Sequence, residues 1–203
     1  MSIRKINIGR GRYHWTAGKE YIMMSTVEGD GLMDKTNIVL IGMPTVGKSS
    51  FGVVLAKALG YRFIDSDLVI QEREGKLLAQ LIAEYGTDGF LRLENEINCG
   101  INVSDAVIAT GGSAVYGAEA MMHFRETGSI VYLEEECSVI MERLLDPKGR
   151  GVTIREGQTI AELYAERKAL YERYAEYTVN VNSKSADEVV TSIINAVRKK
   201  QTV

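Results

Sequence analysis

The sequence predicts an α/β fold in which helices cover both faces of a parallel β-sheet. From Asn37 onward, short apolar runs alternate with longer segments of helical periodicity, which is typical of repeated strand–helix units. A phosphate-binding motif follows the first run directly, and polar or glycine-rich segments follow the next two. Since parallel strands bring their carboxyl ends to one edge, we expect these segments to form a common site.

The expected elements are assigned from hydrophobic periodicity. Apolar runs expected to form strands are Asn37–Ile41, Arg62–Ile64, Ala106–Ala109, Ile130–Leu133 and Thr178–Val181. Segments expected to form helices are Ser50–Leu59, Leu78–Glu84, Phe90–Ile101, Glu119–Thr127, Ser138–Leu145, Ile160–Glu176 and Ala186–Lys199.

Length and composition indicate one globular domain with a short N-terminal extension. Of 203 residues, 45% are hydrophobic and 25% are charged, as in ordinary proteins with a sizeable core. We expect the domain at 35–203. Residues 1–34 are basic, acid-poor and interrupted by glycine, so a flexible or partly ordered extension is expected. A targeting peptide and a translation start at Met33 are the alternatives.

Charge and cysteine content exclude several classes of function. The net charge of −3 does not favour a nucleic-acid partner, and no apolar run approaches the roughly 20 residues of a membrane span. Cys99 and Cys137 form no spaced pair and are expected to be free thiols. We expect a soluble cytoplasmic protein that is a monomer or a weak homodimer, with neither nucleic acid nor membrane as a partner.

The motif at Gly42–Ser49 has the phosphate-loop pattern G-x-x-x-x-G-K-[ST] between a strand and a helix. Backbone N–H groups of such a loop, together with the helix dipole, bind phosphate oxygens. Lys48 would reach the β- and γ-phosphates and Ser49 would bind Mg²⁺. The residues expected to bind the nucleotide here are Thr45, Val46, Gly47, Lys48, Ser49 and Ser50.

Two further strand ends carry polar or glycine residues. Asp65 and Asp67 follow the second run and are expected to share a face, because side chains alternate along a strand. Gly111 and Gly112 follow the third run and would let backbone approach a ligand closely. The alternatives are a helix N-cap for the aspartates and a plain turn for the glycines.

A basic loop and an arginine on an apolar helical face complete the candidate site. The glycine-bearing loop at 146–155 could close over a nucleotide and bring Arg150 or Arg155 to phosphate charge; the alternative is a solvated surface loop. Arg167 lies at helical spacing from Leu163 on an apolar face. An arginine there needs an anion, or else it extends to solvent or forms a structural salt bridge.

Together these residues resemble the shikimate kinase family, over a stretch from about Asn37 to the end. The phosphate loop, the Phe-Ile-Asp-Ser-Asp segment and Gly111-Gly112-Ser113 are similar to family motifs at family spacing. The resemblance implies a three-layer fold like that of nucleoside monophosphate kinases, with sheet order 2-3-1-4-5 and a mobile lid. It also implies an ATP- and Mg²⁺-dependent kinase that converts shikimate to shikimate 3-phosphate in aromatic amino-acid biosynthesis.

The resemblance also implies roles for single residues. Asp67 would orient the acceptor hydroxyl and accept its proton, and Asp65 would support the Mg²⁺ that Ser49 binds. Arg143 would pack against adenine and Arg150 would be the lid arginine. Arg167 would bind the acceptor carboxylate, with Gly111 and Gly112 beside it.

The sequence departs from the family pattern in three places. Leu91 stands where the family has an arginine that grips the acceptor carboxylate, and Arg92 is about 100° further around the helix. Ser113 replaces a glycine, and Gly151 replaces a proline, which predicts a looser lid. Two alternatives therefore stay open: a kinase acting on another small hydroxylated metabolite, of which a nucleoside monophosphate is the less favoured form, and a nucleotide-binding regulator without activity.

Overall fold

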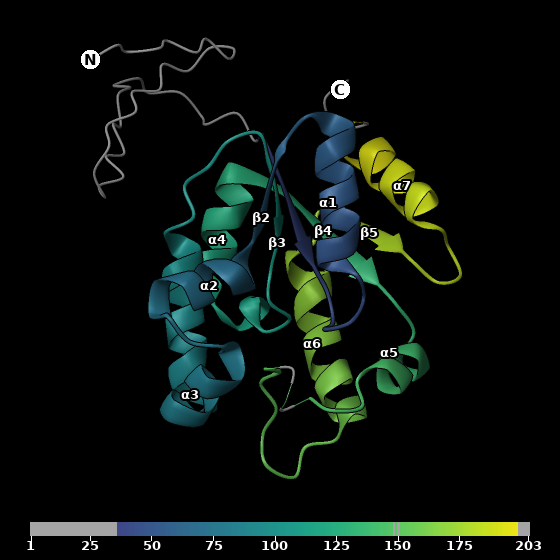
Figure 1. Cartoon of the computed structure of the whole chain (residues 1–203). Coiled ribbons are helices and arrows are strands. Elements are labelled where there is room, and N and C mark those ends of the chain that lie inside the picture. The colour runs from purple at the N-terminus through teal and green to yellow at the C-terminus, as the bar shows by residue number, and fades with distance from the viewer. Residues whose placement is uncertain (1–35, 148, 150, 199–203) are drawn as a thin grey trace, which may run out of the picture. The chain divides into compact units, whose positions relative to one another are not determined.

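The computed structural model describes residues 36–147, 149 and 151–198 (Figure 1). The expected N-terminal extension at 1–34 and Arg150 lie outside the described residues. The strands are β1 (Asn37–Ile41), β2 (Arg62–Asp65), β3 (Ala106–Ala109), β4 (Gly128–Glu134) and β5 (Tyr177–Asn180). The α-helices are α1 (Lys48–Leu59), α2 (Ser66–Glu74), α3 (Leu78–Cys99), α4 (Ala118–Thr127), α5 (Cys137–Arg143), α6 (Ile160–Tyr174) and α7 (Ala186–Arg198), and a short 3₁₀ helix η1 spans Ala114–Tyr116.

The strands form one parallel sheet in the order β2-β3-β1-β4-β5, which confirms the predicted fold class and strand order. This order makes β2, β3 and β1 neighbours. Their carboxyl ends are the three strand ends to which the sequence assigned chemistry, so the topology brings those segments to one edge of the sheet.

Helices cover the sheet on both faces, as the right-handed connection rule requires. From β1 the chain crosses to the edge strand β2, and each later connection between strands runs in the opposite direction, toward β5. With right-handed connections, α1 therefore lies on the opposite face of the sheet from the helices that precede β3, β4 and β5. Accordingly α1 packs with α7, whereas α4 and α6 lie against β4 (Figure 1).

Burial follows position in the sheet. Every residue of β1 and β3 is buried, whereas the edge strands β2 and β5 are partly exposed. Strands of a parallel sheet that are covered on both faces are continuous apolar runs, which is why the central strands were predicted closely. Among the described residues, no helix is both long and apolar enough to cross a membrane.

Helices α2 and α3 differ from the sequence prediction. Helix α2 was not predicted, and it begins at Ser66, directly after β2. The two segments predicted at 78–84 and 90–101 form one helix, α3, which bends at Gly86 (φ 68°, ψ 174°). A second small core joins α2 to both halves of α3 through Ile70, Leu81, Phe90 and Ile97.

Candidate active site

The phosphate loop leads into α1 with its backbone N–H groups free for an anion. Helix α1 begins at Lys48, and its N-cap residue is Gly47. Because glycine has no side chain, no capping hydrogen bond occupies the N–H groups of the first turn. Thr45 adopts a left-handed conformation (φ 68°), and its buried Oγ1 has no hydrogen-bond partner in the described part of the chain. These residues fit a bound phosphate chain.

Lys48 is buried at the floor of this loop. Its Nζ donates to the carbonyl oxygens of Gly42 (2.8 Å) and Met43 (2.9 Å). Burial lowers the pKa of Lys48 to about 8, although the charges of Asp67 and Asp65 oppose this. A buried ammonium without an ion-pair partner is costly, and phosphate oxygens would supply the missing charge.

Asp65 joins the end of β2 to both α1 and α2. Its Oδ2 accepts a hydrogen bond from the Ser49 hydroxyl (2.7 Å), and its Oδ1 accepts one from the backbone N–H of Asp67 (3.1 Å). Asp65 is therefore the N-cap of α2. The expectation that Asp65 and Asp67 alternate along one strand is wrong, because β2 ends at Asp65 and Asp67 lies in the first helical turn. The hydroxyl–carboxylate pair of Ser49 and Asp65 has the oxygen chemistry that Mg²⁺ prefers.

Asp67 shares a confined space with Glu94 from α3. A Cβ atom at Gly111 would collide with Glu94 Oε1 and lie 2.8 Å from Asp67 Oδ1, so only glycine fits between them. Burial raises the pKa of Asp67 to about 6, against the attraction of Lys48. The pKa of Glu94 is raised to about 7, mainly by burial and to a smaller extent by the charge of Asp67. A hydrogen bond from Ser113 opposes this shift.

Arg167 is buried on the inner face of α6, with a relative exposure of 1%. One terminal nitrogen donates to the carbonyl oxygen and the hydroxyl of Thr153 (both 2.7 Å). Its Nε has no hydrogen-bond partner in the described residues, and its guanidinium lies 5.5 Å from the ring centre of Tyr116. No carboxylate pairs with Arg167 among the described residues, and a buried cation of this kind favours an anionic ligand.

A cavity of about 400 Å³ joins these groups. Its walls include the phosphate loop, Asp67 with the glycine pair, and Arg167 with Thr153. The predicted site residues that line it are Thr45, Gly47, Lys48, Ser49, Ser50, Asp67, Gly111, Gly112 and Arg167. Its continuity means that a phosphate chain and a small carboxylated molecule could bind in it together.

Of the remaining predicted site residues that the structure describes, Val46, Asp65 and Arg143 do not line this cavity. Val46 is buried in the core, and its backbone N–H donates to Met43. Arg143, on α5, is half exposed and forms a 3.2 Å ion pair with Glu135, which is itself buried. The lid position of Arg150 stays a prediction.

Glu94 was not assigned a role from the sequence. It lies four residues after Phe90 on the apolar face of α3, where it is 1% exposed and its Oε1 has no partner in the described chain. A carboxylate on an otherwise apolar helical face is the signal that could have identified it.

Comparison with known proteins identifies the family. The family model for shikimate kinase matches residues 44–198. Shikimate kinase of Geobacter sulfurreducens is 36% identical over 171 residues, covering 83% of this chain and 94% of that protein. The chain belongs to the shikimate kinase family. As a member of that family, it is a phosphotransferase with an alcohol acceptor.

Solved structures of shikimate kinases have the same fold. The enzyme from Acinetobacter baumannii in complex with shikimate has a TM-score of 0.75 and 27% identity, covering 83% of this chain and 96% of that one. The enzyme from Aquifex aeolicus has a TM-score of 0.72 and 31% identity, covering 81% and 98%.

Of the three departures in this shikimate kinase family member, two line the cavity. Ser113 is buried and lines the cavity, and its side chain donates a hydrogen bond to Glu94; Gly151 lines the cavity as well. Leu91 does not line this cavity; it faces a second, smaller space behind Thr153. The looser lid expected from Gly151 stays a prediction.

Proposed function

We propose that this protein transfers the γ-phosphoryl group of ATP to the 3-hydroxyl of shikimate. The observation that carries this proposal is the single cavity in which Lys48, Asp67 and Arg167 meet. A phosphate-binding cation, a carboxylate able to accept a proton and a buried cation for the acceptor carboxylate are what this reaction needs. The Acinetobacter baumannii enzyme, which shares this fold, is in complex with shikimate, and this supports the choice of acceptor.

Each group has a distinct role in this proposal. ATP would supply the phosphoryl group, and Mg²⁺ would neutralise phosphate charge. Lys48 and the backbone of the phosphate loop hold the β- and γ-phosphates, Ser49 holds the metal, and Asp65 orients the Ser49 hydroxyl. Asp67 orients the acceptor hydroxyl and accepts its proton, for which a pKa of about 6 is well suited near neutral pH.

The acceptor end is set by Arg167 and the glycine pair. The guanidinium of Arg167 binds the carboxylate, and the absence of side chains at Gly111 and Gly112 leaves room for the ring. Arg143 packs against adenine and Arg150 stabilises the transferring group. The enzyme acts in the cytoplasm, where ATP is available, and has no nucleic-acid or membrane partner.

The test is turnover of shikimate by the purified protein with ATP and Mg²⁺, followed by ADP release. Shikimate-dependent ADP release that disappears with EDTA and in Lys48→Ala is the expected result. Absence of turnover at millimolar shikimate would remove shikimate as the acceptor.

A second candidate is a kinase for a different hydroxylated acid, and Leu91 and Ser113 are the observations that favour it. A panel of hydroxy acids, sugar acids and amino alcohols, tested under the same conditions, distinguishes the two. A kcat/KM for another acceptor at least tenfold above that for shikimate would establish this second function.

A further inference from the structure

A small cavity lies next to the acceptor site, on the other side of Thr153. Its volume is about 10 Å³, so its walls are close together. It is lined by Thr87, Leu91, Tyr116, Thr153, Arg155, Gln158 and Leu163. Leu91 brings no charge to this space. The cation on its wall is Arg155, from the segment that follows the lid glycine.

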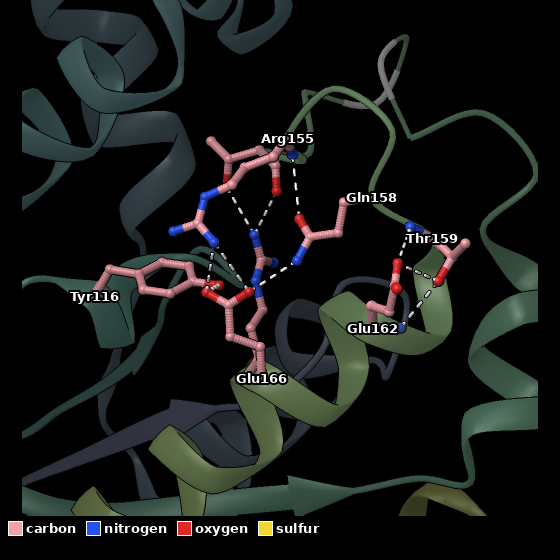
Figure 2. A network of polar contacts seen from close by, with 8 residues as sticks. Tyr116, Arg155, Gln158, Thr159, Glu162 and Glu166 are labelled. Carbon is pink, nitrogen blue, oxygen red and sulfur yellow. Dashed lines mark hydrogen bonds and ion pairs between the residues drawn. The ribbon is translucent and has the colours of Figure 1, made fainter.

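Thr153 and Tyr116 connect Arg155 to the guanidinium of Arg167. Thr153 lines both cavities and accepts two hydrogen bonds from Arg167. The Tyr116 ring lies beside the Arg167 guanidinium, and its hydroxyl donates to Glu166 (3.0 Å). Glu166 is also the carboxylate that Arg155 contacts (Figure 2). Arg155 and Arg167 therefore both lie against a wall that Thr153 and Tyr116 form.

The contact that holds Arg155 is weak. One nitrogen lies 3.4 Å from both oxygens of Glu166, and the Arg155 side chain is 67% exposed. Exposed ion pairs of this kind contribute little to stability. Little free energy therefore keeps Arg155 away from a stronger anion nearby.

Glu166 remains satisfied when Arg155 leaves. Its oxygens also accept hydrogen bonds from the Tyr116 hydroxyl (3.0 Å) and from Gln158 Nε2 (2.8 Å) (Figure 2). Release of Arg155 would therefore not leave this partly buried carboxylate without a partner, which is the costly outcome for polar groups in proteins.

We propose that Arg155 is a specificity-determining residue of the acceptor site. When a carboxylated acceptor binds to Arg167, Arg155 leaves Glu166 and supplies the second positive charge to the acceptor carboxylate. This inference rests on the proposed function. Arg92, the other cation close to Leu91 in the chain, is exposed and lines neither cavity.

The test compares two acceptors, shikimate and its methyl ester, in the wild type and in Arg155→Leu. We expect Arg155→Leu to lower kcat/KM for shikimate about 10- to 100-fold, mainly through KM, as for the loss of a charge-assisted hydrogen bond. For the ester, which lacks the charge, the change should stay within about twofold. Arg155→Lys should recover part of the discrimination, and the matched control Arg92→Leu should leave both acceptors unchanged.

A reciprocal variant moves the charge to the facing helix. Leu91→Arg combined with Arg155→Leu should restore the preference for shikimate over its ester, because the cation again faces the same cavity. Equal losses on both acceptors in Arg155→Leu, no loss at all, or a loss in Arg92→Leu instead would overturn the inference. A wild-type protein that does not phosphorylate shikimate would instead refute the proposed function, so the two failures are distinguishable.

Discussion

At the level of single residues, two buried carboxylates, Asp67 and Glu94, approach each other beside Gly111. Each lies in a place that disfavours its charge, and burial raises the pKa of both. The charge of Lys48 offsets part of this cost for both carboxylates, and that of Arg167 does so for Glu94, although neither cation forms an ion pair with them in the described chain. Such paired and perturbed groups in a cavity are characteristic of functional sites.

Asp67→Asn tests the role of the first carboxylate. We expect kcat to fall at least 100-fold, because an amide cannot accept the hydroxyl proton, while ADP affinity changes less than threefold. In the wild type, kcat/KM should rise with pH through an apparent pKa of about 6, as Asp67 becomes ionised. Steady-state kinetics from pH 5 to 9 and calorimetry of ADP binding provide the measurements. Turnover within tenfold of wild type would contradict the assignment.

Glu94→Gln tests how much the buried second carboxylate lowers the free energy of unfolding. The pKa of Glu94 is raised from 4.5 to about 7 in the folded protein, so between these values the native state binds a proton that the unfolded chain has released. Stability therefore falls as pH rises through this window. The gain in unfolding free energy on replacement by glutamine should be about 2 kcal/mol larger at pH 8 than at pH 5.

Denaturant unfolding at the two pH values measures this difference. The exposed Glu126 on α4 provides the matched control, because Glu126→Gln makes the same chemical change without altering a buried group. Equal effects of Glu94→Gln at both pH values would mean that Glu94 has an ordinary pKa.

At the level of elements, helices α2 and α3 contribute Asp67, Leu78 and Phe90 to the wall of the cavity. The N-cap at Asp65 begins α2 and sets the position of Asp67 in the first turn after the strand end. The bend at Gly86 directs the second half of α3, which carries Phe90, Leu91 and Glu94, toward the glycine pair. The small core between these helices keeps both halves in place.

Gly86→Ala tests the importance of the bend. Gly86 has φ 68° and ψ 174°, a conformation that is essentially restricted to glycine, and a Cβ there would meet no neighbouring atom. We expect a loss of about 1–3 kcal/mol in unfolding free energy from backbone strain alone. Gly60→Ala is the control, since its left-handed conformation (φ 71°, ψ 23°) is also free of contacts but is accessible to alanine at lower cost. A smaller loss for Gly86→Ala than for Gly60→Ala would contradict this explanation.

Sequence patterns predicted the elements where burial is uniform and failed where a local signal overrides periodicity. The central strands β1 and β3 are fully buried apolar runs, and both were predicted to the residue. Helix α2 was missed because the Asp-Ser-Asp segment fits both a strand end and an N-cap, and its helix is mostly polar. The bend at Gly86 was expected to be a break between two helices, since φ and ψ of a single glycine cannot be inferred from periodicity.

At the level of the whole molecule, the sheet order determines which residues can meet. Neighbouring strands β2, β3 and β1 bring Asp67, Gly111 and Lys48 together, and this meeting was predicted from the positions of their segments at strand ends. The positions of Glu94 and Arg155 depend on how α3 and the segment at 151–155 pack against the rest of the domain. That requires packing between elements far apart in the chain, which no local pattern reports.

Nucleotide binding should stabilise the folded domain as a whole. Because a ligand that binds only the native state adds RT ln(1 + [L]/Kd), ADP with Mg²⁺ at 100 times its Kd should add about 2.7 kcal/mol. For a domain of this size the melting temperature should rise by roughly 5–10 °C. Differential scanning fluorimetry tests this, with Lys48→Ala expected to lose most of the shift. An equal shift in Lys48→Ala would mean that the nucleotide binds elsewhere.

The central claim is that one cavity brings a phosphoryl donor to the 3-hydroxyl of a small carboxylated acceptor. The most direct measurement is identification of the product formed from ATP and shikimate by mass spectrometry and ³¹P NMR. We expect shikimate carrying one phosphate on its 3-hydroxyl, formed by the wild type and absent with Lys48→Ala or Asp67→Asn. A phosphorylated product at another position, or no phosphorylated shikimate while another acceptor is consumed, would contradict the claim.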